Sequence, residues 1–310
     1  MSNIIIEIEN QFFATAQSVN VTPAQTLNLE MDGKIHRFAT QDDKHGAKSG
    51  AYYIHADGYP NWGIMDYHIH SEMQKFKLDR EGLNDSLLEQ IGIQTETPKQ
   101  REKRERKEYE QGREKAYKEF NRASNDLAIL SNHKYIKLKK LVSLGPYARI
   151  VVTTQLGDFA RPGDLLIPTI NPYTGKFQAL QRITAKPMTD GKHMKGFFPR
   201  TIVKGSCYPF YAKTPRRIII AEGFATASSI FHYTAGQDTV LAAMTCHNIP
   251  DISQAMRTLH PGAQIIIAAD NDLPGRNAGA KCLEMGIADK VYTPKIEGKD
   301  WNDIINFSLV

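Results

Sequence analysis

Long apolar runs are missing from this sequence of 310 residues, although 41% of its residues are hydrophobic. A membrane-spanning helix needs a run of about eighteen apolar residues or more, and no such run occurs. The opening MSNIIIEIEN also lacks the basic start and the small-residue cleavage site of a secretory signal. We therefore expect a cytoplasmic protein that has no membrane partner.

Cysteine is scarce, with Cys207, Cys246 and Cys282 far apart and no CxxC pair. This spacing excludes a disulfide framework and a zinc ribbon built from these residues, so we expect reduced thiols and no structural zinc. Histidine is more frequent near the start, but the spacing of the five residues fits no closed zinc site. We expect them to contact nucleic acid or to lie at the surface: His36, His45, His55, His68 and His70.

Charge is distributed unevenly along the chain. Residues 1–214 carry 31 lysines and arginines against 24 acidic residues, whereas residues 215–310 carry 8 against 10. A basic part beside an acidic part suits a protein that holds a polyanion and also presents metal-binding carboxylates. Many other globular proteins have a similar composition, so this observation alone excludes little.

Four segments follow from the pattern along the chain. Residues 1–90 open with a predicted helix, followed by short strands and turns, which indicates a small α+β module. Residues 91–132 are rich in strong helix formers and predict a charged linker helix. Residues 133–214 contain two predicted strands around an NPYTG turn and form a basic α+β subdomain. In residues 215–310, short apolar runs alternate with helical segments, which predicts a parallel, doubly wound α/β sheet.

The predicted linker helix allows two interpretations. Its mixed charges are typical of a solvated helix face. Alternatively, the ten basic residues between Lys99 and Arg122 hold a phosphate backbone. The sequence does not decide between the two.

Acidic residues follow three of the predicted parallel strands. Glu222 follows RRIIIA, Asp270 and Asp272 follow AQIIIAA, and Asp300 and Asp303 come after KVYTPK. Because the carboxyl ends of parallel strands meet at one edge of the sheet, we expect these carboxylates to converge on Mg²⁺ or Mn²⁺. Taken singly, Glu222, Asp272 and Asp300 could instead stabilise the start of the next helix.

The segments IIIAEG at 218–223 and DNDLPGRNAG at 270–279 resemble the Toprim domain shared by bacterial-type DNA primases, topoisomerases and some nucleases. The resemblance implies that the Glu-Gly and Asp-x-Asp elements form an acidic metal site. Glu222, Asp270 and Asp272 would then be catalytic residues and metal ligands, and Asp300 and Asp303 further ligands. The closing KDWND segment at 299–303 is similar to that of the primase branch.

Upstream segments are also similar to primase catalytic cores. The stretch 166–175, Gln181-Arg182 and Lys195-Gly196-Phe197 resemble their basic subdomain, which implies that Arg182 and Lys195 face the metal site and bind nucleotide or template. Lys192, Lys204 and Arg276 are further candidates for that role. The stretches DGKIHRF and KSGAYYIHADG near the start resemble primase-like proteins of plasmids and phages.

The sequence also departs from the pattern of replicative primases. No cysteine precedes Cys207, so the zinc ribbon that reads the template is missing. Thr226 stands where many primases have a further acid. No helicase domain fits after Val310, so we expect a separate replicative helicase as the partner.

The N-terminal module offers aromatic and basic residues for DNA binding. Tyrosines and a tryptophan interleaved with lysines could stack single-stranded bases, and packing in a core is the rival interpretation. The candidates for contact with DNA are Lys44, Lys48, Tyr52, His55 and Trp62.

Three functions are compatible with the sequence. The first is a primase that makes short RNA primers on single-stranded DNA from nucleoside triphosphates, with Glu222 as general base or metal-organising carboxylate. The second is a metal-dependent nuclease that uses the same acids. The third is a single-strand-binding accessory protein whose acidic site has lapsed, in keeping with Thr226.

Overall fold

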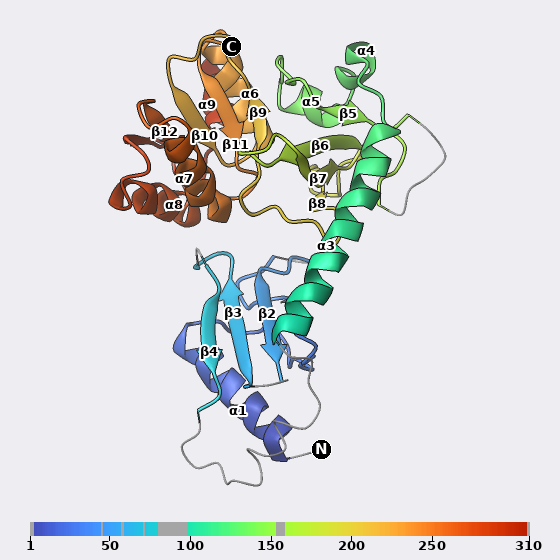
Figure 1. Cartoon of the computed structure of the whole chain (residues 1–310), viewed down its shortest axis with the longest axis vertical. Coiled ribbons are helices and arrows are strands. Elements are labelled where there is room, and N and C mark those ends of the chain that lie inside the picture. The colour runs from blue at the N-terminus through green and yellow to red at the C-terminus, as the bar shows by residue number, and fades with distance from the viewer. Residues whose placement is uncertain are drawn as a thin grey trace. The chain divides into compact units, whose positions relative to one another are not determined.

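The computed structural model describes residues 3–44, 46–56, 59–70, 72–79, 98–152 and 159–308. The chain divides into two compact units, residues 1–105 and 106–310. The long helix α3 (Pro98–Asn121) begins in the first unit and continues in the second (Figure 1). No helix in these ranges is long and apolar enough to cross a membrane. The boundary predicted near residue 90 lies outside the described residues, so the four-part division stays a prediction.

In the described residues up to 79, the first unit has a helix packed on a four-stranded antiparallel sheet. Its elements are α1 (Asn3–Ser18), β1 (His36–Phe38), β2 (Gly50–His55), β3 (Asn61–Asp66) and β4 (Gln74–Lys77), with the strands in chain order. Phe12 of α1 packs against Ile54 and Trp62 of the sheet in one apolar cluster. The indole nitrogen of Trp62 donates to the Thr15 hydroxyl at 2.8 Å, which fixes the helix on the sheet. This arrangement agrees with the predicted α+β module.

The second unit opens with an antiparallel sheet in the order β5-β6-β7-β8. Its elements after α3 are α4 (Leu127–Leu130), α5 (Lys134–Leu138), β5 (Arg149–Ile150), β6 (Leu165–Ile170), β7 (Phe177–Ile183) and β8 (Lys195–Phe197). The turn between β6 and β7 is held by Asn171, whose side-chain oxygen accepts the backbone N–H of Tyr173 at 2.9 Å. Gly175 follows with a φ of +67°, a conformation that favours glycine. The predicted hairpin is confirmed.

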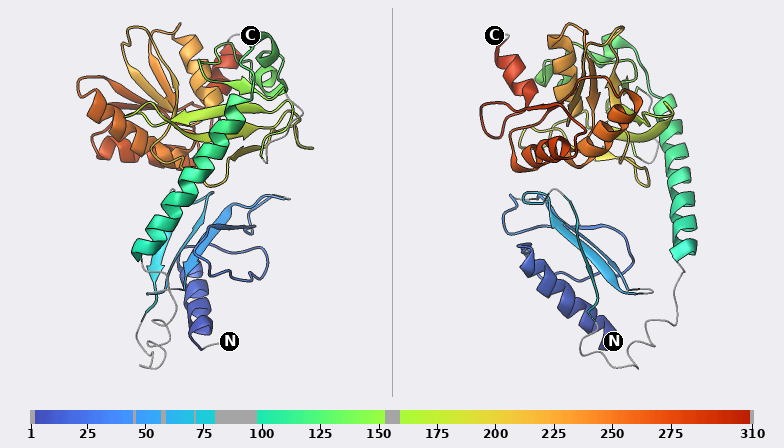
Figure 2. Two further views of the ribbon diagram at one scale, coloured as in Figure 1. Left: turned by 45° about the vertical axis from the view of Figure 1, so that its right-hand side comes forward. Right: turned by 60° about the vertical axis from the view of Figure 1, so that its left-hand side comes forward.

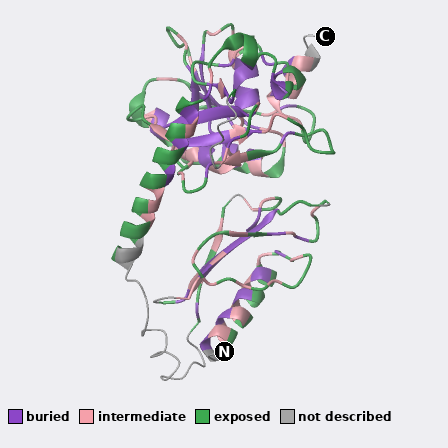
Figure 3. Ribbon diagram, turned by 90° about the vertical axis from the view of Figure 1, so that its right-hand side faces the viewer, coloured by how far each residue is buried: buried purple, intermediate pink, exposed green. Residues whose placement is uncertain are grey.

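Helix α3 differs from the predicted linker helix. It ends at Asn121, because Ser124 pairs with Ile150 and the chain joins the sheet there. Much of its surface is exposed, as Figure 3 shows. However, Ala116 and Phe120 are buried in a cluster with residues of β6 and β7. The second half of α3 is therefore part of the packed second unit.

A mixed, mainly parallel sheet completes the second unit, in the order β13-β12-β10-β11-β9. Its strands are β9 (Tyr208–Phe210), β10 (Ile218–Ala221), β11 (Thr239–Ala242), β12 (Ile265–Ala268) and β13 (Lys290–Tyr292). The helices are α6 (Phe224–Tyr233), η1 (Cys246–Asn248), α7 (Ile249–Leu259), α8 (Leu273–Glu284) and α9 (Trp301–Ser308). Strands β10 to β13 are parallel, as predicted, and β9 is an antiparallel edge strand that was not predicted.

Helices cover both faces of this sheet (Figure 2). Ile219 and Ala221 belong to the same apolar cluster as Phe224 of α6 and Ile305 of α9. The alternate residues Ile218 and Ile220 pack with α7 and α8 on the other face. Burial on both faces explains why these strands read as continuous apolar runs rather than as alternating patterns.

The two sheets of the second unit share one core. The Tyr208 hydroxyl of β9 donates to the Leu144 carbonyl oxygen at 2.7 Å and accepts the backbone N–H of Tyr147 at 3.0 Å. Ile183 of β7 lies in the same cluster as Ala221 of β10. This shared packing fixes β8 relative to the carboxyl end of β10.

Candidate active site

The order of the parallel strands creates a switch point between β10 and β12. The chain passes from β10 to β11 on one side and then returns to β12 on the other. In open α/β sheets, ligands bind at the carboxyl ends of the strands at such a point. Ala221 pairs with Ala268, so Glu222 and Asp270 follow neighbouring strands at this edge.

The carboxylates at this edge perturb one another. Withdrawal from water raises the pKa of Glu222 to about 7, and repulsion from Asp272 and Asp300 adds to the effect. The pKa of Asp270 is raised to about 8 by the same loss of hydration and by the charges of Glu222, Asp300 and Asp272. The structure therefore brings four of the five predicted acids within electrostatic reach of one another.

Asp270 has a buried carboxylate oxygen, Oδ1, with no hydrogen-bond partner among the described residues. Buried polar atoms are rarely left without a partner, and a divalent cation would satisfy this one. Within the described parts of the chain, no three of the acids at the strand ends have ligand atoms all within 4.8 Å of one another. Mg²⁺ commonly keeps several of its waters, so water-mediated ligation fits this spacing.

Asp272 has the capping role that the sequence left open. Its Oδ1 accepts the backbone N–H of Gly275 at 2.8 Å and caps α8. Its charge also raises the pKa of Glu222, so capping and participation in the acidic site coexist. A Cβ on Gly275 would lie 2.6 Å from the Asp270 carbonyl oxygen, which explains the glycine at this position.

Asn271, between the two aspartates, holds the loop that precedes α9. Its backbone N–H donates to the Lys299 carbonyl oxygen at 3.0 Å, and its own carbonyl oxygen accepts the N–H of Gly298 at 2.7 Å. The Arg276 guanidinium donates to the Asn271 side-chain oxygen at 2.8 Å and lies 3.9 Å from Glu297. Arg276, a predicted phosphate contact, thus has a positioning role in this structure.

Asp300 and Asp303 occupy different surroundings. Asp300 accepts the backbone N–H of Asp303 at 2.8 Å and contributes to the acidic group at the strand ends. The Lys139 ammonium lies 3.5 Å from Asp300 and 3.3 Å from Asp303, and Lys299 lies 3.6 Å from Asp303. Burial alone would lower the pKa of Lys139, but the two aspartates outweigh it and raise it.

A basic pocket of about 530 Å³ lies beside the acidic group. Lys195 of β8 reaches the acids closely enough to lower the pKa values of both Glu222 and Asp270. The lysines and the histidine that line the pocket are Lys139, Lys140, Lys192, His193 and Lys195, and Asp303 lines it as well. Lys139, Lys140 and His193 were missed, because no motif marks them in the sequence.

The prediction that Arg182 faces the metal site together with Lys195 is wrong. Ile183 pairs with Lys195, whereas Arg182 pairs with Gly196, and successive residues of a strand point to opposite faces. The Arg182 guanidinium donates to the Phe159 carbonyl oxygen and lies 3.6 Å from Asp164. Arg182 therefore stabilises the far face of the sheet.

Lys204 also lies apart from the basic pocket. Its side chain is exposed and approaches Asp251 at 3.9 Å.

Cys246 was not predicted as a site residue, but its backbone N–H donates to the Glu222 carboxylate. Burial, with the charges of Glu222 and Asp272, raises the pKa of its thiol to about 12. Its place four positions after the end of β11, in the loop at the carboxyl edge of the sheet, is the signal that could have identified it.

The N-terminal candidates for DNA contact separate into two groups. Trp62 and Tyr52 are 0% and 3% exposed in the core of the first unit, so the prediction that they stack bases is corrected in favour of the core interpretation. Lys44 and Lys48 are exposed, and His55 is partly buried. Of the residues considered earlier, His45, Asp57 and Gly58 lie outside the described residues.

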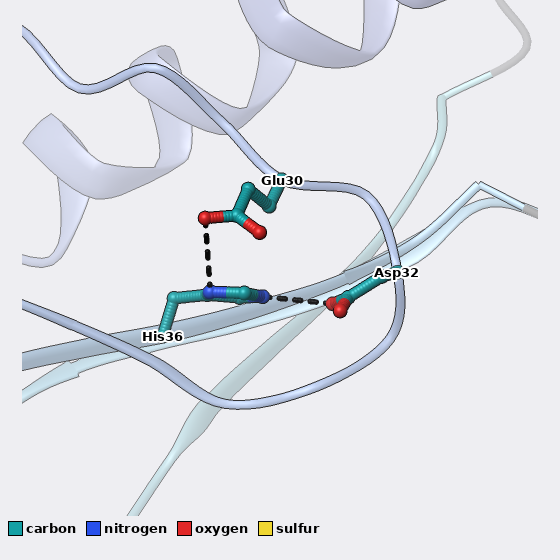
Figure 4. Close-up of side chains that lie close together, drawn as sticks. All are labelled: Glu30, Asp32 and His36. Carbon is teal, nitrogen blue, oxygen red and sulfur yellow. Dashed lines mark hydrogen bonds and ion pairs between the residues drawn. The ribbon is translucent and has the colours of Figure 1, made fainter.

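Three side chains of the first unit form a compact group (Figure 4). His36 Nε2 lies 2.7 Å from Asp32, and Nδ1 lies 3.6 Å from Glu30. Burial opposes ionisation of Asp32, but hydrogen bonds from His36 and from the backbone and side chain of Lys34 together outweigh it and hold the pKa of Asp32 well below its usual range. These contacts give the DGKIHRF stretch a structural role.

Part of the chain matches a known domain family, and most of the chain is similar to a DNA primase. Residues 217–308 match the family described as the Toprim domain. DNA primase TraC of Escherichia coli is 29% identical over 270 residues, which cover 85% of this chain and 23% of TraC. The resemblance to Toprim-containing primases is confirmed, and the chain spans about a quarter of the length of this relative.

Two solved structures are similar to the chain. The DnaG catalytic core is 14% identical, with a TM-score of 0.43, over 64% of this chain and 76% of that chain. The primase fragment of the bacteriophage T7 primase-helicase protein is 15% identical, with a TM-score of 0.34, over 47% of this chain and 62% of that chain.

Proposed function

We propose that this chain is the catalytic part of a DNA primase, which synthesises short RNA primers on single-stranded DNA from nucleoside triphosphates. The observation that supports it most is the gathering of carboxylates at the switch point, where Glu222 and Asp270 have raised pKa values and Lys195 lies beside them. The similarity to TraC favours primer synthesis over other Toprim reactions. A separate replicative helicase is the partner we propose.

The acidic residues suit a divalent metal site. Glu222, Asp270, Asp272 and Asp300 would hold Mg²⁺ or Mn²⁺, because all four offer hard carboxylate oxygens. A bound metal ion would neutralise charge on the triphosphate and stabilise charge that develops during the displacement. The partnerless Oδ1 of Asp270 supports this assignment.

The basic pocket suits the phosphates of the incoming nucleotide. Lys195, Lys192 and Lys139 line it and would bind the triphosphate as point charges. The 3′-hydroxyl oxygen of the growing primer then forms a bond to the α-phosphorus, the α–β phosphoanhydride bond breaks, and pyrophosphate leaves. Glu222, with a pKa of about 7, is suited to accept the hydroxyl proton near neutral pH.

Incubation with single-stranded DNA, labelled nucleoside triphosphates and Mg²⁺ or Mn²⁺ tests the proposal. We expect new oligonucleotide products from the unaltered chain, and a loss of about 100-fold or more in Asp270→Asn. Binding of single-stranded DNA should stay unchanged in this variant. Glu284→Gln, an exposed neutralisation on α8, is the matched control and should retain synthesis.

Other outcomes would contradict the proposal. Shortened DNA that depends on metal and on Asp270 would indicate a nuclease. Binding of single-stranded DNA with neither synthesis nor cleavage would indicate an accessory binding protein.

A further inference from the structure

Another hollow of the second unit lies between α3 and the β6–β7 hairpin. It has a volume of about 950 Å³, and its lining includes residues of α3, such as Lys107, and residues of the hairpin, such as Phe177 of β7. Pro168 and Ile170 line it and alternate with Ile167, which belongs to the core shared with the parallel sheet. The hollow, which we name the α3 groove, is therefore on the opposite face of the antiparallel sheet from Lys195.

Aromatic rings line the α3 groove. Tyr117 is 48% exposed and Tyr147 is 37% exposed, although both are large and partly apolar. The Tyr117 ring meets Phe177 edge to face, with 5.3 Å between the ring centroids. The Arg149 guanidinium lies 4.2 Å from the centroid of the Phe120 ring. The rings of Tyr117 and Tyr147 are thus partly packed against the protein and partly exposed to solvent.

The charges of the groove are dominated by cations. Lys107, Arg113, Arg149 and Lys176 line it, together with Glu110 and Glu114. Each of these acids already pairs with a cation of its own helix: Glu110 with Arg106 at 3.2 Å, and Glu114 with Lys118 at 2.7 Å. The lining is therefore net positive, and a bound anion would meet little opposing charge.

We propose that the α3 groove binds single-stranded nucleic acid, with bases stacked on Tyr117 and Tyr147 and phosphates at Lys107, Arg113 and Lys176. Aromatic faces interleaved with cations are the arrangement that recognises single strands, because only unpaired bases expose their faces. A duplex would use the cations but not the rings. This inference rests on the proposed function and deepens it, because it assigns to α3 the binding of a single strand at a place separate from the acidic site.

Fluorescence anisotropy of a labelled oligothymidylate, titrated with the full chain, tests the proposal. Tyr117→Ala removes one stacking surface, and we expect binding to weaken about tenfold. The charge reversal of Lys107→Glu combined with Arg113→Glu should weaken binding by at least as much and reduce its salt dependence. Tyr117→Phe keeps the ring and should bind as the unaltered chain does.

Lys115→Glu is the matched control for charge. Lys115 lies on the same helix and is exposed, but it lines a different hollow, beside Gly112 and Phe198. We expect its affinity for the oligonucleotide to stay near that of the unaltered chain. Equal weakening by Lys115→Glu, or unchanged affinity in both groove variants, would overturn the proposal. Stacking in the groove would also be refuted if Tyr117→Ala weakened duplex binding as much as single-strand binding.

The same variants separate this inference from the proposed function. At saturating template, the groove variants should retain synthesis, because no groove residue lines the acidic site. If the unaltered chain binds single strands but makes no primers, and Tyr117→Ala loses that binding, the proposed function would fail and the groove assignment would stand. If primers formed and every groove variant bound normally, only the groove assignment would fail.

Discussion

At the scale of single residues, Asp272 has two roles that require different chemistry. As the cap of α8 it needs only an acceptor oxygen, which it provides to Gly275 at 2.8 Å. As a member of the acidic group it needs a negative charge, which it exerts on Glu222. Asparagine keeps the acceptor and loses the charge, so substitution can separate the two roles.

We predict that Asp272→Asn loses metal-dependent synthesis but leaves the free energy of unfolding nearly unchanged. Asp272→Ala should lose synthesis and also about 1 kcal/mol of stability, because the cap is removed. Urea unfolding followed by circular dichroism, together with the synthesis assay, measures both effects. Normal synthesis in Asp272→Asn would show that the charge at this position is dispensable.

The sequence predicts the acids of the site better than its cations. Glu222 directly follows β10, and Asp270 and Asp272 come within four positions of the end of β12, so local pattern and parallel topology together predict their convergence. Lys139 reaches Asp303 across 164 positions of the chain, and no local signal predicts that contact. For Arg182, the strand was predicted but the face was not, because a shift of one position reverses the direction of a side chain.

At the scale of elements, strong local signals predict structure and sparse ones do not. The β6–β7 hairpin follows from its turn residues, and the parallel strands follow from apolar runs buried on both faces. Helix α3 packs through few residues, spaced at four positions, of which Gly112 and Ala116 are small. Because this apolar stripe is narrow and most other positions of the helix are charged, the sequence pattern favours a solvated linker helix.

We predict that Gly112→Ala destabilises the protein, although this change usually stabilises a helix interior by about 1 kcal/mol. A Cβ at this position would overlap the backbone carbonyl oxygen of Arg200, so α3 would have to move. The expected loss is about 1–3 kcal/mol in the free energy of unfolding, measured by urea denaturation. Lys115→Ala, in the next turn, should change stability by less than about 0.5 kcal/mol. A more stable Gly112→Ala would show that α3 does not pack closely here.

At the scale of the whole molecule, two sets of titrating groups limit stability from opposite sides. The pKa of His133 is lowered to about 4 by burial and by His193. Between about pH 6.5 and pH 4 the unfolded state therefore binds more protons at this residue, and its contribution to stability falls as the pH is lowered. Glu222 and Asp270 have raised pKa values of about 7 and 8. Above about pH 4.5 the folded state therefore holds protons that the unfolded state has released, and stability falls as pH rises to about 8.

We predict that the Tm of the metal-free chain falls by a few degrees between about pH 5 and pH 8.5, because the two protons that Glu222 and Asp270 retain in the folded state outweigh the one that His133 fails to bind. Saturating Mg²⁺ should raise Tm more at pH 8 than at pH 6, because the metal binds the ionised carboxylates and compensates their repulsion. Asp270→Asn should flatten the alkaline decline and reduce the Mg²⁺ effect, whereas Glu284→Gln should do neither. Calorimetry from pH 5 to 9, with and without Mg²⁺, measures these shifts. A Mg²⁺ effect that is independent of pH, or that persists in Asp270→Asn, would mean that the ion binds elsewhere and that the carboxylates at the switch point are not its ligands.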